Sequence, residues 1–390
     1  MSKNDPEPRS VPITRPWLDE AEVEASSRAI RSGWVTQGPE VAAFEQEFSA
    51  LVGAKYACAV SSCTSALHLA LLAVGVKAGD EVITVSHSYI ATANSIRYCG
   101  ATPVFVDIQP GTWNMEPEAI DQAATDRTRA ILCVHQMGMP CDLKKILQIA
   151  ERRSLPVVED AACAVGSEIL WKNHWEKVGK PHGDVACFSF HPRKLITTGD
   201  GGMLTTSNQK WDKNLRHWRQ HGMSVSDALR HDSNQVIFES YPSLGYNYRL
   251  TDIQAAVGRE QLKKLPQLIQ RRRHLADRYR ELLGDLPGLQ LPEEPAWAHS
   301  NWQSYCVRLP ESSSQREVMQ YLLDRGISTR RGIMCAHRED AYGDRPQPWP
   351  LPESERAQVQ CILLPLFHEL TEDDQDYTAT TLTEALQQGD

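Results

Sequence analysis

The sequence predicts an α/β protein in which a large domain with a mainly parallel seven-stranded sheet is followed by a smaller C-terminal α+β domain. Short apolar runs alternate with helical patterns between about residues 55 and 206. The apolar runs are continuous, which is typical of strands that are buried on both faces. Alternation of such strands with helices indicates a parallel sheet covered by helices.

The strands and helices of the large domain follow from this alternation. Seven apolar runs are predicted as strands, at residues 56–60, 81–85, 102–106, 130–134, 155–158, 184–190 and 202–206. Helical patterns lie between several of them, at residues 64–74, 91–99, 117–124 and 143–152.

The rest of the chain predicts an insertion, a loop region and a second lobe. Residues 168–183 read as a hairpin between strands, and 219–246 lack periodicity, so we expect a loop-rich segment close to the functional site. A long helix is expected over 251–284. Beyond it the pattern indicates a strand at 304–309, a helix at 315–325, an irregular proline-rich stretch and a terminal helix. We therefore expect a large domain over residues 1–265, including an N-terminal arm, and a small domain over residues 266–390.

Composition excludes several classes of protein. The 390 residues include 41 basic and 50 acidic side chains, which give a net charge of −9. This balance argues against sequence-independent binding of nucleic acid, which needs a basic surface. The longest apolar stretch, residues 66–76, is too short to span a membrane. No secretory signal is visible in the polar first ten residues.

Ten cysteines are scattered without a zinc-like spacing, so no metal site is expected. Cys58, Cys133 and Cys187 lie within apolar runs, where cysteine acts as a small hydrophobic residue. This usage suits a reduced, cytoplasmic protein.

Polar residues gather where the predicted strands end. They are Ser86 to Tyr89, His135, Glu159 with Asp160, and His191 to Lys194. Because ligands of open α/β sheets bind at the carboxyl ends of the strands, these residues indicate a site, although most strand-end polar residues are merely turn residues.

Lys194 is the most informative of these residues, because it follows an apolar strand and precedes a glycine cluster at 199–202. An isolated lysine is usually a solvated surface charge. In this setting its amine could form a Schiff base, provided that burial lowers its pKa.

Two further features supply the other groups that a binding site for pyridoxal phosphate (PLP) requires. Asp160 could hold the pyridine nitrogen in its protonated form, although a strand-end aspartate is equally often a helix cap. Thr64 and Ser65 open an apolar helix whose N-terminus suits a phosphate, where the alternative is a plain N-cap. Ser189 could reach the same phosphate, and Tyr89 could stack on the cofactor ring or simply pack.

The chain resembles the sugar aminotransferases of the DegT/StrS type, which are fold type I PLP enzymes. The resemblance runs from about Val11 to Leu386. It rests on the motifs Ser32-Gly-Trp-Val-Thr-Gln-Gly-Pro39, Phe44-Glu-Gln-Glu-Phe48, Ser62-Cys-Thr-Ser-Ala-Leu-His-Leu-Ala-Leu71, Glu159-Asp-Ala-Ala162, Ser189-Phe-His-Pro-Arg-Lys194 and Gly245-Tyr-Asn-Tyr-Arg-Leu-Thr-Asp252.

This resemblance implies roles for the site residues. It implies Lys194 as the Schiff-base lysine, Asp160 as the partner of the pyridine nitrogen and Tyr89 over the ring. Thr64, Ser65 and Ser189 are implied at the phosphate.

The resemblance also implies a homodimer with shared active sites, because Asn247 resembles the residue that reaches a phosphate in the neighbouring subunit. Two cofactor-site positions depart from the family. Cys63 stands where glycine is frequent, which is tolerable if its φ is negative. Cys163 stands where glutamine or histidine often contacts the cofactor.

The implied reaction is transfer of an amino group from L-glutamate or L-glutamine to a keto-sugar in amino-sugar biosynthesis, and we expect this sugar to be linked to a nucleotide. Arg249 and His337 are candidate substrate-binding residues. A keto-cyclitol acceptor is an alternative, as is a catalytically silent binding or sensor protein of the same fold. A sugar dehydratase of the family would carry histidine in place of Lys194.

Overall fold

A seven-stranded sheet forms the centre of the large domain. The computed structural model describes residues 9–225, 230, 233–343 and 347–388. The sheet order is β1-β9-β8-β5-β4-β2-β3. Every pairing is parallel except those of β9, which runs antiparallel to β1 and β8. The strands are β1 Tyr56–Val60, β2 Glu81–Val85, β3 Thr102–Val106, β4 Thr128–Val134, β5 Val157–Asp160, β8 Val185–Ser189 and β9 Gly202–Thr206.

The predicted fold class and strands are confirmed. The bounds of β1, β2, β3 and β9 are those expected from the sequence. β4 begins two residues earlier than expected, and β5 lies two residues later than expected and so ends on Asp160. The helices of this domain are α1 Glu20–Ser32, α2 Pro39–Val52, α3 Cys63–Ala73, α4 Ile90–Tyr98, α5 Glu118–Ala123, α6 Leu143–Arg153 and α7 Gln209–Trp218.

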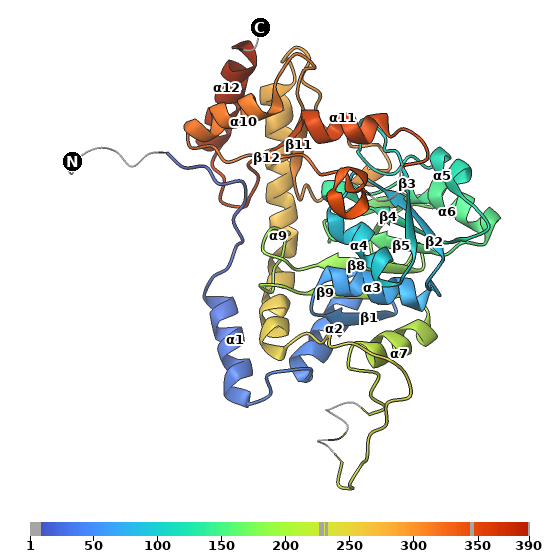
Figure 1. Cartoon of the computed structure of the whole chain (residues 1–390). Coiled ribbons are helices and arrows are strands. Elements are labelled where there is room, and N and C mark those ends of the chain that lie inside the picture. The colour runs from blue at the N-terminus through green and yellow to red at the C-terminus, as the bar shows by residue number, and fades with distance from the viewer. Residues whose placement is uncertain (1–8, 226–229, 231–232, 344–346, 389–390) are drawn as a thin grey trace.

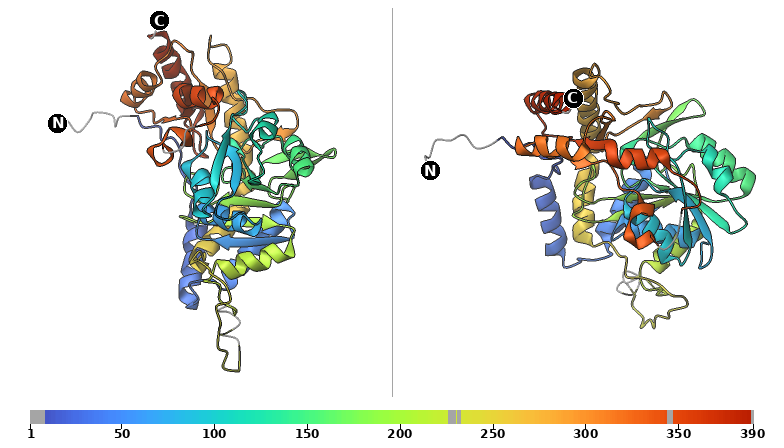
Figure 2. Two further views of the ribbon diagram at one scale, coloured as in Figure 1. Left: turned by 45° about the vertical axis from the view of Figure 1, so that its right-hand side comes forward. Right: turned by 45° about the horizontal axis from the view of Figure 1, so that its top comes forward.

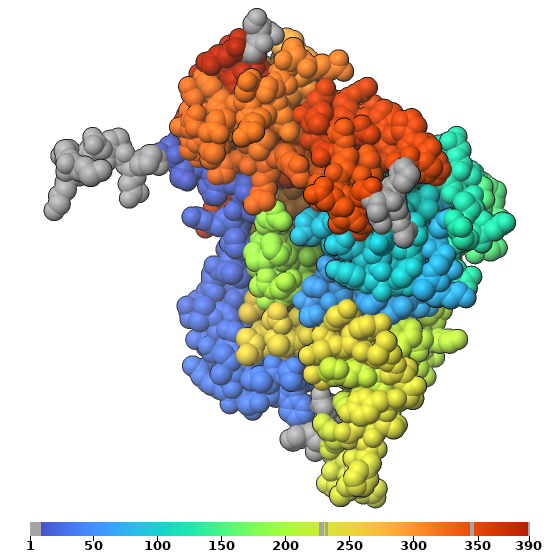
Figure 3. Space-filling view, viewed as in Figure 1, coloured from blue at the N-terminus to red at the C-terminus, as the bar shows by residue number. Residues whose placement is uncertain are grey.

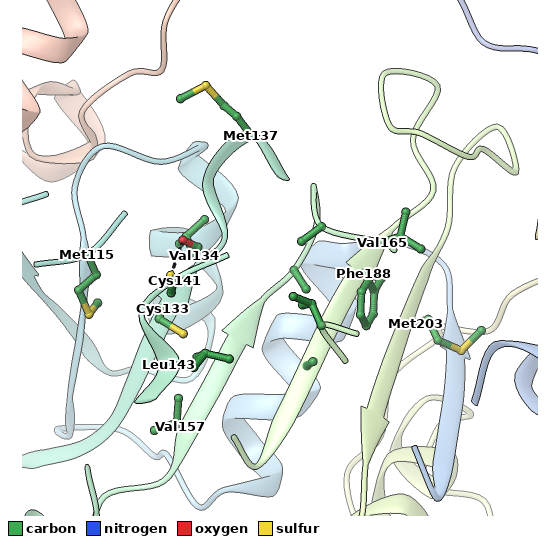
Figure 4. Close-up of a cluster of buried hydrophobic side chains, with 14 of the residues drawn as sticks. Met115, Cys133, Val134, Met137, Cys141, Leu143, Val157, Val165, Phe188 and Met203 are labelled. Carbon is green, nitrogen blue, oxygen red and sulfur yellow. Dashed lines mark hydrogen bonds between the residues drawn. The ribbon is translucent and has the colours of Figure 1, made fainter. Parts of the chain in front are cut away.

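Helices cover both faces of the sheet, as β8 illustrates. Ala186 and Phe188 belong to the apolar cluster that includes residues of α2 and α6, part of which Figure 4 shows. Val185 and Cys187 belong to the cluster on the other face, which includes residues of α3, α4 and α7. Because successive side chains of a strand point to opposite faces, a continuous apolar run is what such a strand requires.

The long helix α9 (Asp252–Leu283) joins the two lobes (Figure 1). It begins with a capping box, in which the side chains of Thr251 and Gln254 each accept a hydrogen bond from the backbone N–H of the other residue. Ala255 and Leu265 lie in the large-domain core, whereas Leu275 and Tyr279 lie in the small-lobe core. The helix continues through Pro266, so the expected division at residues 265 and 266 stays a prediction.

The small lobe is built on a three-stranded sheet of order β11-β13-β12 (Tyr305–Arg308, Cys361–Leu364 and Arg330–Arg331). It is flanked by α10 (Gln315–Asp324), α11 (Pro352–Gln360) and α12 (Glu372–Gln387). In the space-filling view this lobe, in orange and red, lies over the large domain (Figure 3). None of the described helices is both long and apolar enough to cross a membrane.

The predicted hairpin is confirmed, as β6 (Glu168–Trp171) pairs with β7 (His174–Lys177) beside β10 (Ala298–His299). The segment 219–246 is loop-rich as expected, and its described residues 233–246 contain no helix or strand. Its described residues 233–246 extend away from the body of the molecule in all three ribbon views (Figures 1 and 2). None of its described residues lines the large cavity described below, so within one chain it does not lie close to the site.

Candidate active site

A cavity of about 670 Å³ lies between the strand ends of the large domain and the small lobe. The large domain contributes Ser62 to Thr64, Ser88, Tyr89, Thr92, Asp160, Cys163, Ser189 and Lys194. The small lobe contributes Gln303, Ser304, Met319, Thr329 to Met334 and Leu363 to Leu366, except Pro365. The cavity therefore collects most of the predicted site residues on one wall.

Lys194 lies in the turn that follows β8, where its backbone N–H donates to the carbonyl of His191 at 2.8 Å. Its Nζ donates to Sγ of Cys163 at 3.0 Å. Burial disfavours the charged amine, but Cys163, Cys63 and Asp160 together raise the pKa of Lys194 above its ordinary value. The lowered pKa expected from burial is therefore not found, because the two cysteines and Asp160 outweigh burial.

Asp160 ends β5 and is only 4% exposed. Its Oδ2 accepts from Oγ1 of Thr92 at 2.7 Å, and its Oδ1 accepts from the N–H of Ala162 at 3.2 Å. Burial raises the pKa of Asp160, while these hydrogen bonds and the charge of Lys194 oppose the rise. Ser88 Oγ lies 2.8 Å from Thr92 Oγ1 and completes a short chain of hydroxyls leading to the carboxylate.

The N-terminus of α3 forms another part of the wall. Ser62 is the N-cap, and its Oγ accepts from the N–H of Ser65 at 3.1 Å. Thr64 lines the cavity, whereas Ser65 is buried and lies 2.9 Å, Oγ to Oγ, from Ser62. Cys63 is the first residue of α3 and is not among the residues with positive φ, so the condition on its backbone is met.

Gly202 allows the start of β9 to approach this helix end closely. A Cβ at Gly202 would lie 2.5 Å from the carbonyl carbon of Ser62 and 2.7 Å from the N of Cys63. Any other residue would displace the N-terminus of α3. Ser189, at the end of β8, also lines the cavity.

These groups fit PLP. The cavity offers an amine for the aldehyde, a buried carboxylate for the pyridine nitrogen, and hydroxyls with free N–H groups at a helix N-terminus for the phosphate. Tyr89 is 65% exposed at the mouth of the cavity, where its ring is available for stacking.

Besides Ser65, three predicted residues do not line the cavity of their own chain. Asn247 is exposed, and its backbone forms an isolated bridge with Gln220. Arg249 is partly buried outside the cavity. His337 lies in a short 3-10 helix and is held between Ser86, at 2.6 Å, and Glu355, at 3.3 Å. His337 therefore ties the small lobe to the end of β2.

The structure adds residues that the sequence did not single out. Thr92 lies in the first turn of α4, and its hydroxyl contacts that of Ser88, which precedes the N-cap residue Tyr89, but no motif marks Thr92. Arg193 and Arg330 line the cavity, and neither has a carboxylate partner among the described residues. Arg331, beside Arg330, pairs with Glu339 at 3.8 Å.

Comparison with known proteins agrees with this geometry. A family model described as the DegT/DnrJ/EryC1/StrS aminotransferase family matches residues 16–383. The aminotransferase TlmJ from Streptoalloteichus hindustanus is 32% identical, with a TM-score of 0.89, over 97% of this chain and all of that one.

Two further solved structures are similar over nearly their whole length. Spr1654 from Streptococcus pneumoniae, known in a PMP form and a PLP form, is 27% identical with a TM-score of 0.89; the PMP form matches over 97% of this chain and 100% of its own. DesI, solved in the presence of its TDP-sugar product, is 30% identical with a TM-score of 0.86, over 99% of this chain and 95% of its own.

Proposed function

Since this chain belongs to the DegT/DnrJ/EryC1/StrS aminotransferase family of PLP-dependent sugar aminotransferases, we propose that it transfers an amino group from L-glutamate or L-glutamine to a nucleotide-linked keto-sugar. The observation that carries the proposal is one cavity that brings together an amine, a buried carboxylate, a helix N-terminus and the side chains of Arg193 and Arg330. Bound PLP supplies an electron sink for the negative charge that develops on the α-carbon of the donor.

Lys194 would hold the cofactor and would also serve as the acid and base. When its amine is free, it would take the proton from the α-carbon of the donor and return a proton at the cofactor C4′. Its place in the turn after β8, at the cavity wall, keeps it within the same small volume in both states. The second half of the reaction, with the keto-sugar, uses the same residue in reverse.

Asp160 maintains the protonated pyridine nitrogen in this scheme. Its carboxylate is held by the hydroxyl of Thr92 and the N–H of Ala162, so the oxygens keep one orientation. Thr64, Ser189 and the first N–H groups of α3 would hold the phosphate, with Cys63 contributing backbone and Ser65 supporting the N-cap.

A homodimer would complete the site. Asn247 is exposed and cannot serve the cavity of its own chain, which supports the proposal that it reaches the phosphate site of a second copy. The preceding segment bears exposed apolar side chains, among them Val236, Phe238 and Leu244, which are between 80% and 90% exposed. Such a surface is typical of a protein interface. The ten free thiols suit an enzyme that works in the cytoplasm.

Arg193 and Arg330 support an acceptor that carries a diphosphate. Guanidinium groups bind phosphate oxygens well, and these two have no carboxylate partner among the described residues. A free keto-cyclitol, the alternative acceptor, offers no such anion. A silent binding protein would not need Lys194, Asp160 and the phosphate site to be intact together.

The test is the absorption spectrum of the holoenzyme before and after addition of L-glutamate or L-glutamine. We expect the visible band of the lysine-bound cofactor to give way to the band of the amino form, and keto-sugar nucleotides to restore the first band. The Lys194→Ala variant should bind PLP without this conversion. A band that neither donor changes would refute the proposed donors. Normal turnover by Lys194→Ala would refute the role of the lysine.

A further inference from the structure

Cys163 differs from every other cysteine of the chain. Nine of the ten cysteines are buried, and Cys163 alone is partly exposed, at the wall of the cavity. Its Sγ lies 3.0 Å from Nζ of Lys194 and is the acceptor of the only hydrogen bond that this amine makes to a described side chain.

The backbone around Cys163 fixes the position of this sulfur. Asn301, which is fully buried, donates from Nδ2 to the carbonyl oxygens of Cys163 and Val165, each at 2.8 Å. One residue before Cys163, the N–H of Ala162 donates to Asp160. The turn that carries the sulfur is therefore held at both ends, by the small lobe on one side and by the cofactor carboxylate on the other.

We propose that Cys163 is a positioning residue whose sulfur holds the Lys194 amine in place whenever the lysine is not bonded to the cofactor. This inference rests on the proposed function, in which Lys194 is released and must stay close to the reacting carbon. A thiol ends one atom beyond Cβ, directly beside the amine.

The groups that face Lys194 set the pKa of its amine, so loss of the Cys163 sulfur can be measured as a change in this pKa. They are Cys163, Cys63 and Asp160, which raise the pKa of the amine, and His191, whose own pKa is lowered by burial and by nearby Arg193. Removing the Cys163 sulfur takes away a partner of the charged amine, so the pKa of Lys194 should fall. The neutral amine, which attacks the PLP aldehyde, would then be present at lower pH.

The experiment measures the rate at which cofactor-free, full-length protein takes up PLP as a function of pH, followed by the visible absorption band. Cys163→Ala should shift the profile to lower pH by about one unit, and Cys163→Ser, whose shorter side chain still offers an acceptor, by less. Cys99→Ala, which removes a buried thiol that does not line the cavity, should leave the profile unchanged.

Circular dichroism establishes that each variant is folded, and the serine variant carries the comparison if the alanine variant is not. Profiles of Cys163→Ala and Cys163→Ser that coincide with the wild type, or move to higher pH, overturn this inference alone. Wild-type protein that takes up no PLP at any pH overturns the proposed function and this inference with it.

Discussion

At the scale of single residues, the sequence did not reveal the hydrogen bond from the hydroxyl of Thr92 to Asp160. This bond strongly influences the protonation state of the carboxyl group. The hydroxyl donates to the buried carboxylate at 2.7 Å and is itself paired with Ser88. Among the influences that oppose burial, this hydrogen bond ranks first in lowering the pKa of Asp160. Thr92 therefore helps to keep the carboxylate charged in a site that would otherwise favour the neutral acid.

Thr92→Val should shift the acid limb of the kcat–pH profile to higher pH by about one unit, because a hydrogen bond to a charged group contributes about 1.5–3 kcal/mol. Without the hydroxyl the pKa of Asp160 rises further, so the carboxylate becomes protonated at a higher pH as the solution is acidified. Thr92→Ser keeps the hydroxyl and should retain the wild-type profile. An unchanged acid limb in Thr92→Val would contradict this role.

The sequence could place Lys194 and Asp160 at strand ends, because an apolar run followed by a polar residue identifies both. It could not reveal Thr92 or the contact between Cys163 and Lys194, since these depend on how α4 and the turn at 161–166 fold over the sheet edge. Ser65 shows what the sequence could suggest but not locate in detail. It belongs to the predicted helix start, yet its hydroxyl contacts the hydroxyls of Ser61 and Ser62 and does not line the cavity.

At the scale of elements, a buried ion cluster anchors the edge strand β1 to α2 and α7. Glu45 of α2 accepts from the N–H of Ala59 at 2.8 Å and pairs with Arg216 at 2.5 Å and with Arg219. Arg219 in turn donates to the carbonyl of Ala59 at 2.7 Å. Arg219 is only 5% exposed, so it depends on Glu45 for its charge partner.

Glu45→Gln should lower the free energy of unfolding at pH 7 by about 3–5 kcal/mol, because it leaves a buried guanidinium unpaired. Although burial opposes it, the two arginines lower the pKa of Glu45 below its ordinary value. Its stabilising effect is therefore present above the ordinary pKa of a glutamate and is lost as the pH falls through the lowered value in the folded state. The difference between variant and wild type should shrink over that acid range.

Urea unfolding at neutral and acidic pH measures this effect. Asp121→Asn, which removes a surface carboxylate paired with Arg152 and Arg153, is the matched control and should change stability by less than about 1 kcal/mol. An equal loss in both variants would show that Glu45 stabilises the fold no more than a surface pair does.

The helix α11 shows why some elements escaped prediction. It begins with Pro352 and has no side-chain cap from its own N-cap residue, Leu351. Asp107, at the end of β3, supplies the cap by accepting from the N–H groups of Glu353 and Ser354 at 2.9 and 2.8 Å. In its local sequence Asp107 is typical of a turn residue. No pattern near residue 352 indicates that the residue capping α11 lies at the end of β3.

At the scale of the whole molecule, the proposed shared active sites predict complementation between inactive variants. In a mixed dimer of Lys194→Ala and Asn247→Ala, one site would combine the intact Lys194 of one chain with the intact Asn247 of the other. With random pairing half of the dimers are mixed and each has one of two sites intact, so about a quarter of wild-type activity should return.

Activity after co-refolding or co-expression of the two variants measures this, and each variant mixed with itself is the control. Equilibrium sedimentation of the wild type gives the mass of the assembly. Recovery that remains at the level of the separate variants, in a protein that sediments as a dimer, would show that Asn247 does not act across subunits.

The continuity of α9 has a consequence for how the chain melts. Its first half is buried in one apolar core, with Ala255 and Leu265, and its second half in the other, with Leu275 and Tyr279. If either core unfolds, it exposes one half of a helix whose other half is still packed in the other core. Unfolding of one lobe therefore destabilises the other. We therefore expect a single cooperative calorimetric transition. Cleavage of the chain at residue 265 would break a helix that both cores share, so it would not yield two independently folded domains.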